Sequence, residues 1–143
     1  VVDGNNPIYP ITAAGFARNI DNFVILGGTV TYPLIQIAYY MGFTTVLLLG
    51  IDHTYPKAGI VKPGEAFVAG EKDPDHFQPS DGHPYFEAGK CYNAPELERT
   101  TVTYGWAREF FALEGRRIIN LTPNSQLDVF EKMSIDQWLK DDR

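Results

Sequence analysis

The chain alternates short segments rich in apolar, strand-type residues with longer segments in which apolar residues recur every three or four positions. The short segments are Phe23–Leu26, Thr45–Leu49 and Arg117–Leu121. Short apolar runs bounded by turn residues are typical of buried strands. The pattern therefore predicts three strands. Thr45–Leu49 is apolar on both faces, so we expect it to be the central strand of a parallel sheet that helices cover on each side.

The segments with helical spacing predict three helices. The first is expected to begin near Thr31 or Tyr32 and to end at Gly42, which suits the left-handed residue that follows many helices. A second helix is expected over Glu96–Glu114. The segment Ser134–Leu139 begins with a capping-type serine and has a short amphipathic pattern, which predicts one or two helical turns.

The order strand, helix, strand, long loop, helix, strand predicts an α/β fold, a Rossmann-like parallel sheet with flanking helices. We expect one domain over residues 1–143, with a long flap at 53–94 after the central strand. The flap is rich in glycine and proline, but its aromatic residues favour an ordered structure. Because three strands make a thin sheet, we expect either an N-terminally incomplete domain or completion by self-association.

Composition narrows the class of protein. Of 143 residues, 44% are hydrophobic and 21% are charged, which is typical of a soluble globular domain. No segment has the length of a membrane span or the pattern of a signal peptide, so we expect a cytoplasmic protein. The single cysteine, Cys91, rules out an internal disulfide and a cysteine-based zinc site. The net charge of −6 argues against a nucleic-acid surface.

Asp52 and His53 form the first candidate site, because they follow the strand Thr45–Leu49. Ligands of open α/β sheets bind at the carboxyl ends of the strands. An aspartate there can bind a ribose hydroxyl or orient a neighbouring group, and a histidine can transfer protons near neutral pH. The alternative is a turn-capping aspartate beside a solvated histidine. With His76 these residues match no recognised ligand motif, so we predict no metal site.

The flap contains two further histidines, and each lies within two positions of an acidic residue. Asp75 precedes His76, and Asp81 lies two positions before His83. A carboxylate sets the tautomer of an imidazole and raises its basicity, as a general base requires. His76 is the better candidate, because the neighbours of His83 are typical of a simple turn.

Two junctions of a strand with the following segment are candidate nucleotide contacts. In the first, Gly28, Thr29 and Thr31 combine a flexible backbone with hydroxyl donors at a helix N-terminus, a suitable environment for a phosphate. In the second, Asn124 and Ser125 carry side chains that can bind a base or a sugar. For both junctions the alternative is a tight turn with helix-capping residues.

Several runs of the sequence together resemble the MptE-like family, which includes archaeal 6-hydroxymethylpterin diphosphokinases and is related to domains of motility-associated flagellin glycosyltransferases. The resemblance covers nearly everything from Gly27 onward. The runs that carry it are Gly28–Thr31, Leu34–Phe43, Val46–His53, Asp75–Phe77, Pro95–Glu98, Gly115–Asn120 and Leu127–Phe130.

More distantly, the chain is similar to bacterial lipooligosaccharide sialyltransferases, which use CMP-activated sialic acid on a Rossmann-like fold. The shared features are the helix start at Gly28-Thr29, the Gly50–Asp52 strand end and the Pro123–Ser125 turn. This resemblance implies a catalytic histidine in the flap, which His76 matches, and a phosphate-stabilising tyrosine near Tyr55. If the resemblance holds, we expect the N-terminal portion of the family, with its glycine-rich nucleotide loop, to be missing, so that the chain would hold only part of the donor site.

The resemblance implies a transferase, and we favour glycosyl transfer from a nucleotide-activated sugar to a small-molecule or glycan acceptor. In this hypothesis His76 is the base, and Asp52 and His53 position the donor or acceptor. The two junctions contact the nucleotide. The first alternative is pyrophosphoryl transfer from ATP to a pterin alcohol, in which Asp52 would serve Mg²⁺. The second is a non-catalytic remnant that binds a nucleotide or assembles into a homo-oligomer.

Overall fold

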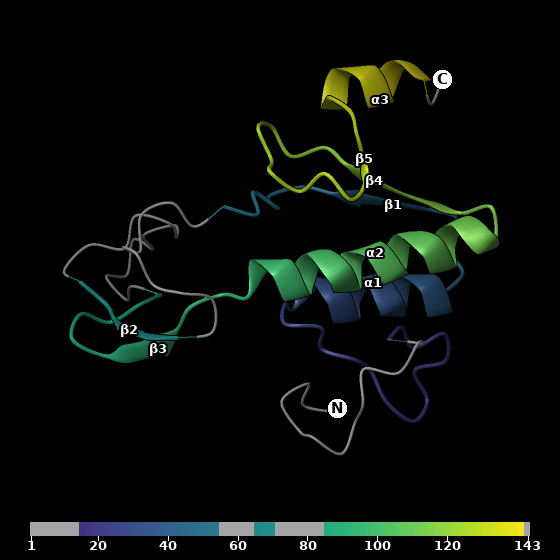
Figure 1. Ribbon diagram of the computed structural model, residues 1–143. Helices are drawn as coiled ribbons and strands as arrows, with labels where there is room; N and C mark the ends of the chain where they lie inside the picture. The colour runs from purple at the N-terminus through teal and green to yellow at the C-terminus, as the bar shows by residue number, and fades with distance from the viewer. Residues whose placement is uncertain (1–14, 55–64, 71–84, 142–143) are drawn as a thin grey trace. The chain divides into compact units, whose positions relative to one another are not determined.

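The computed structural model of the protein describes residues 15–54, 65–70 and 85–141 (Figure 1). The chain divides into two compact units. The first takes its described residues from Val1–His53 and Glu98–Arg143, and the second takes them from Thr54–Leu97. The second unit therefore corresponds closely to the segment that the sequence identifies as a flap.

The first unit contains a three-stranded parallel sheet in the order β1-β4-β5. The strands are β1 (Thr45–Leu48), β4 (Arg117–Asn120) and β5 (Glu131–Lys132). Leu47 of β1 is in register with Ile119 of β4, and Ile119 is in register with Glu131 of β5. The predicted α/β class and parallel sheet are confirmed.

Two helices, α1 (Thr31–Tyr40) and α2 (Leu97–Leu113), lie side by side on one face of this sheet (Figure 1). Their positions confirm the predicted first and second helices. They pack on β1 and β4 through a core rich in aromatic rings, in which edge-to-face pairs predominate. The buried members of this core are Phe16, Tyr32, Ile35, Tyr39, Leu48, Tyr104, Ala107, Phe111, Ile118, Leu127 and Phe130.

The third helix, α3 (Ile135–Asp141), follows β5 and confirms the predicted final helical turns. Ser134 caps it, because its hydroxyl accepts a hydrogen bond from the Gln137 backbone N–H at 3.2 Å. Gln137 Oε1 in turn accepts from the Ser134 N–H at 2.9 Å. This reciprocal pair is a capping box. No helix within the described ranges has the length and apolar character needed to cross a lipid bilayer.

The prediction that Thr45–Leu49 is the central strand is wrong, because it is not central in the sheet that the described strands form. Instead, β4 pairs on both sides and β1 lies at the edge. Leu47 and Leu49 are accordingly 41% and 63% exposed, whereas Ile119 of β4 is fully buried. A strand that is apolar on both faces is typical of parallel sheets, but its side chains do not reveal whether both backbone edges are paired.

The predicted strand at Phe23–Leu26 is also wrong, because only Ile25 makes an isolated bridge. The fully buried side chain of Gln36 on α1 binds this backbone instead. Its Oε1 accepts from the N–H groups of Ala17 at 2.9 Å and Ile25 at 3.2 Å. Its Nε2 donates to the carbonyls of Ile25 at 2.7 Å and Tyr32 at 3.1 Å. One amide therefore holds the segment before α1 in place.

Glu114, just after α2, joins three parts of the first unit. It accepts a hydrogen bond from the Tyr39 hydroxyl at 2.5 Å and forms ion pairs with Arg18 at 2.9 Å and Arg116 at 2.7 Å. Arg116 also donates to the Tyr39 carbonyl at 2.7 Å and lies over the Tyr39 ring. The Tyr39 hydrogen bond and the two arginines lower the pKa of the Glu114 carboxyl.

This lowered pKa predicts a pH dependence of stability. A carboxyl whose pKa is depressed by folding stabilises the native state above its ordinary pKa of 4.5, and this contribution is lost as the pH falls through the folded-state pKa. In Glu114→Gln that dependence disappears. We therefore expect the difference in unfolding midpoint between wild type and Glu114→Gln, measured by denaturant titration, to be constant above about pH 5 and to shrink as the pH falls below 4.5. A difference independent of pH would contradict this interpretation.

The second unit contains a two-stranded antiparallel sheet of β2 (Ala66–Val68) and β3 (Cys91–Asn93). Phe67 of β2 is in register with Tyr92 of β3, and Phe86 packs against both rings at centroid distances of 5.3 Å and 4.5 Å. The Tyr92 hydroxyl accepts from the Glu87 N–H at 2.9 Å. The sequence predicts an ordered flap for this segment but not these strands.

Candidate functional site

The candidate site lies at the carboxyl edge of the sheet in the first unit. Strands β1 and β4 are parallel and adjacent, with Leu48 in register with Asn120. The segments that follow them, 49–53 and 121–126, therefore leave the sheet side by side. This adjacency brings together Asp52-His53 and Asn124-Ser125, which lie more than seventy positions apart in the sequence.

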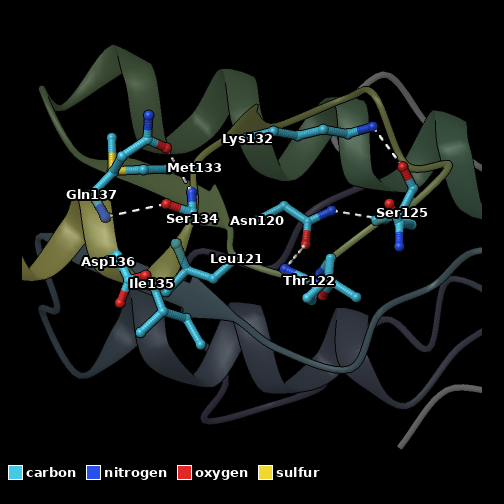
Figure 2. A pocket seen from close by; sticks show the side chains of 12 residues that line it. Asn120, Leu121, Thr122, Ser125, Lys132, Met133, Ser134, Ile135, Asp136 and Gln137 are labelled. Atoms are coloured by element: carbon cyan, nitrogen blue, oxygen red, sulfur yellow. Dashed lines mark hydrogen bonds between the residues drawn. The ribbon is translucent and has the colours of Figure 1, made fainter.

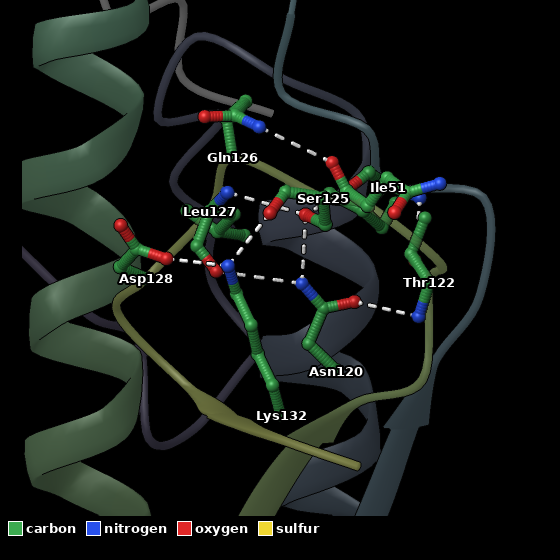
Figure 3. Close-up of polar contacts among 9 residues, drawn as sticks. Ile51, Asn120, Thr122, Ser125, Gln126, Leu127, Asp128 and Lys132 are labelled. Carbon is green, nitrogen blue, oxygen red and sulfur yellow. Dashed lines mark hydrogen bonds and ion pairs between the residues drawn. The ribbon is translucent and has the colours of Figure 1, made fainter. Parts of the chain in front are cut away.

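Three hydrogen bonds join these two segments directly, and Figure 3 shows the residues of the first two, Ile51, Thr122 and Ser125. The Ile51 N–H donates to Thr122 Oγ1 at 3.0 Å, and the Ser125 hydroxyl donates to the Ile51 carbonyl at 2.6 Å. The Gln126 N–H donates to the Asp52 carbonyl at 2.8 Å. The backbone that carries Asp52 is therefore held by the loop after β4.

Asn120, the last residue of β4, is the centre of this network (Figure 3). It is 1% exposed; its Nδ2 donates to Ser125 Oγ at 2.9 Å and its Oδ1 accepts from the Thr122 N–H at 3.0 Å. Asn120 is not among the site residues predicted from the sequence. A carboxamide directly after the apolar pair Ile118-Ile119 of a predicted strand is the signal that could have revealed it, because a polar group buried there needs hydrogen-bond partners.

Ser125 and Asn124, both predicted to contact a nucleotide, have different environments. Ser125 is 5% exposed, and its oxygen interacts with Ile51, Asn120 and the Leu127 N–H. Its hydroxyl therefore holds the loop in place. Asn124 is exposed and has a left-handed backbone, with a φ of 57°. Of the two, only Asn124 offers its side chain to solvent.

A pocket of about 640 Å³ opens beside this loop (Figure 2). Its volume lies within the range of small-molecule sites. The ammonium of Lys132 donates to the Ser125 carbonyl at 2.6 Å and forms an ion pair with Asp128. The residues that line the pocket are Asn120, Leu121, Thr122, Pro123, Asn124, Ser125, Lys132, Met133, Ser134, Ile135, Asp136 and Gln137.

His53 is half-buried and also has a left-handed backbone, with a φ of 56°. Its Nε2 lies 3.0 Å from Thr101 Oγ1, on the second turn of α2. Its ring meets that of Tyr104 edge to face, with the centroids 6.1 Å apart. Burial lowers the pKa of the imidazole, so His53 is predominantly neutral at pH 7.

The glycine turn before α1 lies against the same part of α2. The Thr103 hydroxyl donates to the Gly27 carbonyl at 3.1 Å, and a Cβ on Gly28 would lie 3.1 Å from the Thr100 methyl. Gly27 has a φ of 61°, and a Cβ there would overlap the Tyr32 ring. Both features require glycine at this position.

The threonines of this junction do not cap α1, contrary to the alternative interpretation from sequence. The N-cap residue is Val30, and no side chain caps the helix. Thr29 Oγ1 accepts from the Thr31 N–H at 3.4 Å, a long contact within the turn. The first turn of α1 is therefore stabilised by backbone hydrogen bonds to Thr29 and Val30 rather than by a side-chain cap.

The remaining predicted site residues, His76 and Tyr55, lie outside the described residues, as does His83. Their predicted roles stay predictions. Within the parts of the chain that are described, no three or more His, Cys, Asp or Glu side chains cluster as a metal site would require.

Comparisons with known proteins do not assign the chain to a family. No protein-family profile matches it. No curated protein and no solved structure shows significant similarity to it either. The functional interpretation therefore depends on the residues of the chain and the geometry of this edge.

Proposed function

We propose that the protein is a nucleotide-sugar-dependent glycosyltransferase whose donor binds at the carboxyl edge of the sheet. One observation carries the proposal: the N-terminal half of α2 contacts both the Gly27-Gly28 turn and His53. The Gly27-Gly28 turn and His53, which are distant in sequence, therefore both contact the same part of α2. The loop after β4, held by Asn120, adds the third segment to this edge.

The donor phosphate would bind at the start of α1. The glycines at positions 27 and 28 keep side chains away from the backbone there, and the helix has no side-chain cap. The helix dipole favours an anion at such a position. This arrangement is consistent with a nucleotide as the ligand of a chain whose net charge is −6.

The sugar hydroxyls of the donor would bind Asp52. Its side chain is exposed at the end of β1, and its backbone carbonyl is fixed by the Gln126 N–H. A carboxylate accepts hydrogen bonds from two neighbouring hydroxyls, as a ribose presents them. Asn124 and the adjoining pocket provide further polar groups for the remainder of the donor.

In the reaction, His76 would take the proton from the acceptor hydroxyl as the acceptor oxygen attacks the anomeric carbon. The bond between that carbon and the phosphate oxygen breaks, and the nucleotide leaves with the bonding electron pair. The transfer is fast only if the enzyme holds the base, the acceptor and the donor in the geometry of the reaction.

Nucleotide binding gives the direct test. The nucleotides to test are CMP, UDP, GDP, ADP and ATP. We expect at least one of them to raise the melting temperature of the protein, because a ligand of the native state stabilises that state by mass action. Asp52→Asn should weaken that binding about tenfold, since one charge-assisted hydrogen bond contributes roughly 1.5 kcal/mol. The measurement is a thermal-shift titration with and without Mg²⁺, followed by calorimetry.

Glu109→Gln is the matched control, because it makes the same change of charge at an exposed position three turns along α2. Its affinity for the nucleotide should equal that of the wild type. Binding of ATP alone with a strict Mg²⁺ requirement would favour the diphosphokinase reaction. Absence of binding for every nucleotide would contradict both reactions and favour the non-catalytic alternative.

A further inference from the structure

We infer that Thr101 is a positioning residue that holds His53 as the Nε2–H tautomer, so that Nδ1 is a hydrogen-bond acceptor for a sugar hydroxyl. The inference deepens the proposed function and depends on it for the identity of the hydroxyl. It assigns His53 a chemical role distinct from that of His76. The evidence for the inference is the geometry of His53 and of its neighbours on α2.

The side chains of His53 and Thr101 lie within hydrogen-bond distance of each other. His53 Nε2 and Thr101 Oγ1 are 3.0 Å apart, a normal hydrogen-bond distance. The hydroxyl proton of a helical threonine commonly goes to a carbonyl one turn earlier in its own helix. In the proposed arrangement Thr101 Oγ1 is the acceptor, and His53 Nε2 carries the proton. In a neutral imidazole the other nitrogen, Nδ1, is consequently unprotonated.

The ring is held in this orientation from several sides. Tyr104, which is 2% exposed, packs edge to face against it. The carbonyl of the preceding residue, Asp52, is bonded to the Gln126 N–H. The positive φ of His53 is costly for a non-glycine residue and persists only where the surroundings impose it. The imidazole is therefore preorganised before any ligand binds.

The properties of this nitrogen define the class of group that it binds. Nδ1 makes no hydrogen bond to any residue that the structure describes. An unprotonated imidazole nitrogen accepts from a hydroxyl or an amide and gains nothing from a phosphate oxygen. The preceding residue, Asp52, is exposed and carries a second acceptor at the same strand end, which suits a ligand with several sugar hydroxyls. His53 is thus suited to the sugar of the donor rather than to its phosphate.

The tautomer can be measured without any substrate. The chain has three histidines, so a two-dimensional ¹⁵N–¹H NMR spectrum of the ring nitrogens is simple, and His53→Gln identifies the signals of His53. At pH 8, above the ordinary imidazole pKa of about 6.5, we expect a protonated Nε2 and an unprotonated Nδ1. In Thr101→Val the ratio of Nε2–H to Nδ1–H tautomer should fall about fivefold, as expected for the loss of one hydrogen bond. Thr101→Ser should restore it.

Two results would overturn the inference: a predominant Nδ1–H tautomer in the wild type, or the same tautomer ratio in Thr101→Val. Thr101 is exposed and valine has its shape, so the variant is expected to fold. Addition of CMP then separates the inference from the proposed function. A shift of the Nδ1 signal supports both. If His53 is the Nε2–H tautomer but its signals respond to no nucleotide, the role of Thr101 is supported and the proposed function is contradicted.

Discussion

Replacing Gln36 with leucine should lower the free energy of unfolding by roughly 3–5 kcal/mol, because each buried polar group left without a partner costs about 1–3 kcal/mol. Gln36 is fully buried and makes four hydrogen bonds. Leucine fits the volume but leaves the N–H groups of Ala17 and Ile25 and the Ile25 carbonyl unpaired. The measurement is equilibrium unfolding in urea, followed by tryptophan fluorescence and circular dichroism.

The matched control is Gln126→Leu, the same substitution at an exposed position where the amide makes one long bond to the Asn124 carbonyl. It should change the free energy of unfolding by less than about 0.5 kcal/mol. Hydrogen exchange adds a local test: the amides of Ala17 and Ile25 should lose protection in Gln36→Leu. Equal stability of the two variants would show that Gln36 does not hold the segment before α1.

The parts of the fold that the sequence predicts correctly are those set by local pattern. The strands β1 and β4 contain runs of strand-type residues, and the helices α1 and α2 have apolar residues at helical spacing and end just before Gly42 and Gly115. Ser134 likewise predicts the start of α3, because a capping box is a local interaction. For these elements local preference and tertiary packing agree.

The parts that the sequence does not predict depend on distant partners. Phe23–Leu26 has strand-like residues, yet the backbone of Ile25 bonds to a side chain of α1 instead of a strand. The strands β2, β3 and β5 have two or three residues each, too few for a periodicity to be visible. The edge position of β1 depends on which strands pair, and its side chains carry no information about that.

In the candidate site, too, some residues can be predicted from the sequence and others cannot. The rule that ligands bind at the carboxyl ends of strands identified Asp52, His53, Asn124 and Ser125 from sequence, and the structure places all four at one edge. The residues that fix their geometry, Asn120 and Thr101, could not be identified in this way. Thr101 acts on a residue of another element, so no local motif marks it, and Asn120 is marked only by a polar side chain after two apolar strand residues.

Replacing His76 with alanine should reduce sugar transfer about a hundred- to ten-thousand-fold while nucleotide affinity stays unchanged, if His76 is the general base of the proposed reaction. The base acts on the acceptor proton in the transition state, so its loss affects turnover and not ground-state binding of the donor. The measurement uses the sugar conjugate of whichever nucleotide stabilises the protein, with release of free nucleotide as the readout. Calorimetry with the nucleotide gives the affinity in parallel.

His83→Ala is the control, because this histidine occurs in the same flap segment and also lies within two positions of an aspartate. Its turnover should match that of the wild type. If both variants retain full activity, a flap histidine is not the base, and the unprotonated Nδ1 of His53 becomes the remaining imidazole able to accept the proton. His53→Gln would then have to abolish turnover. This series therefore distinguishes a base in the flap from a base held by α2 at the carboxyl edge of the sheet.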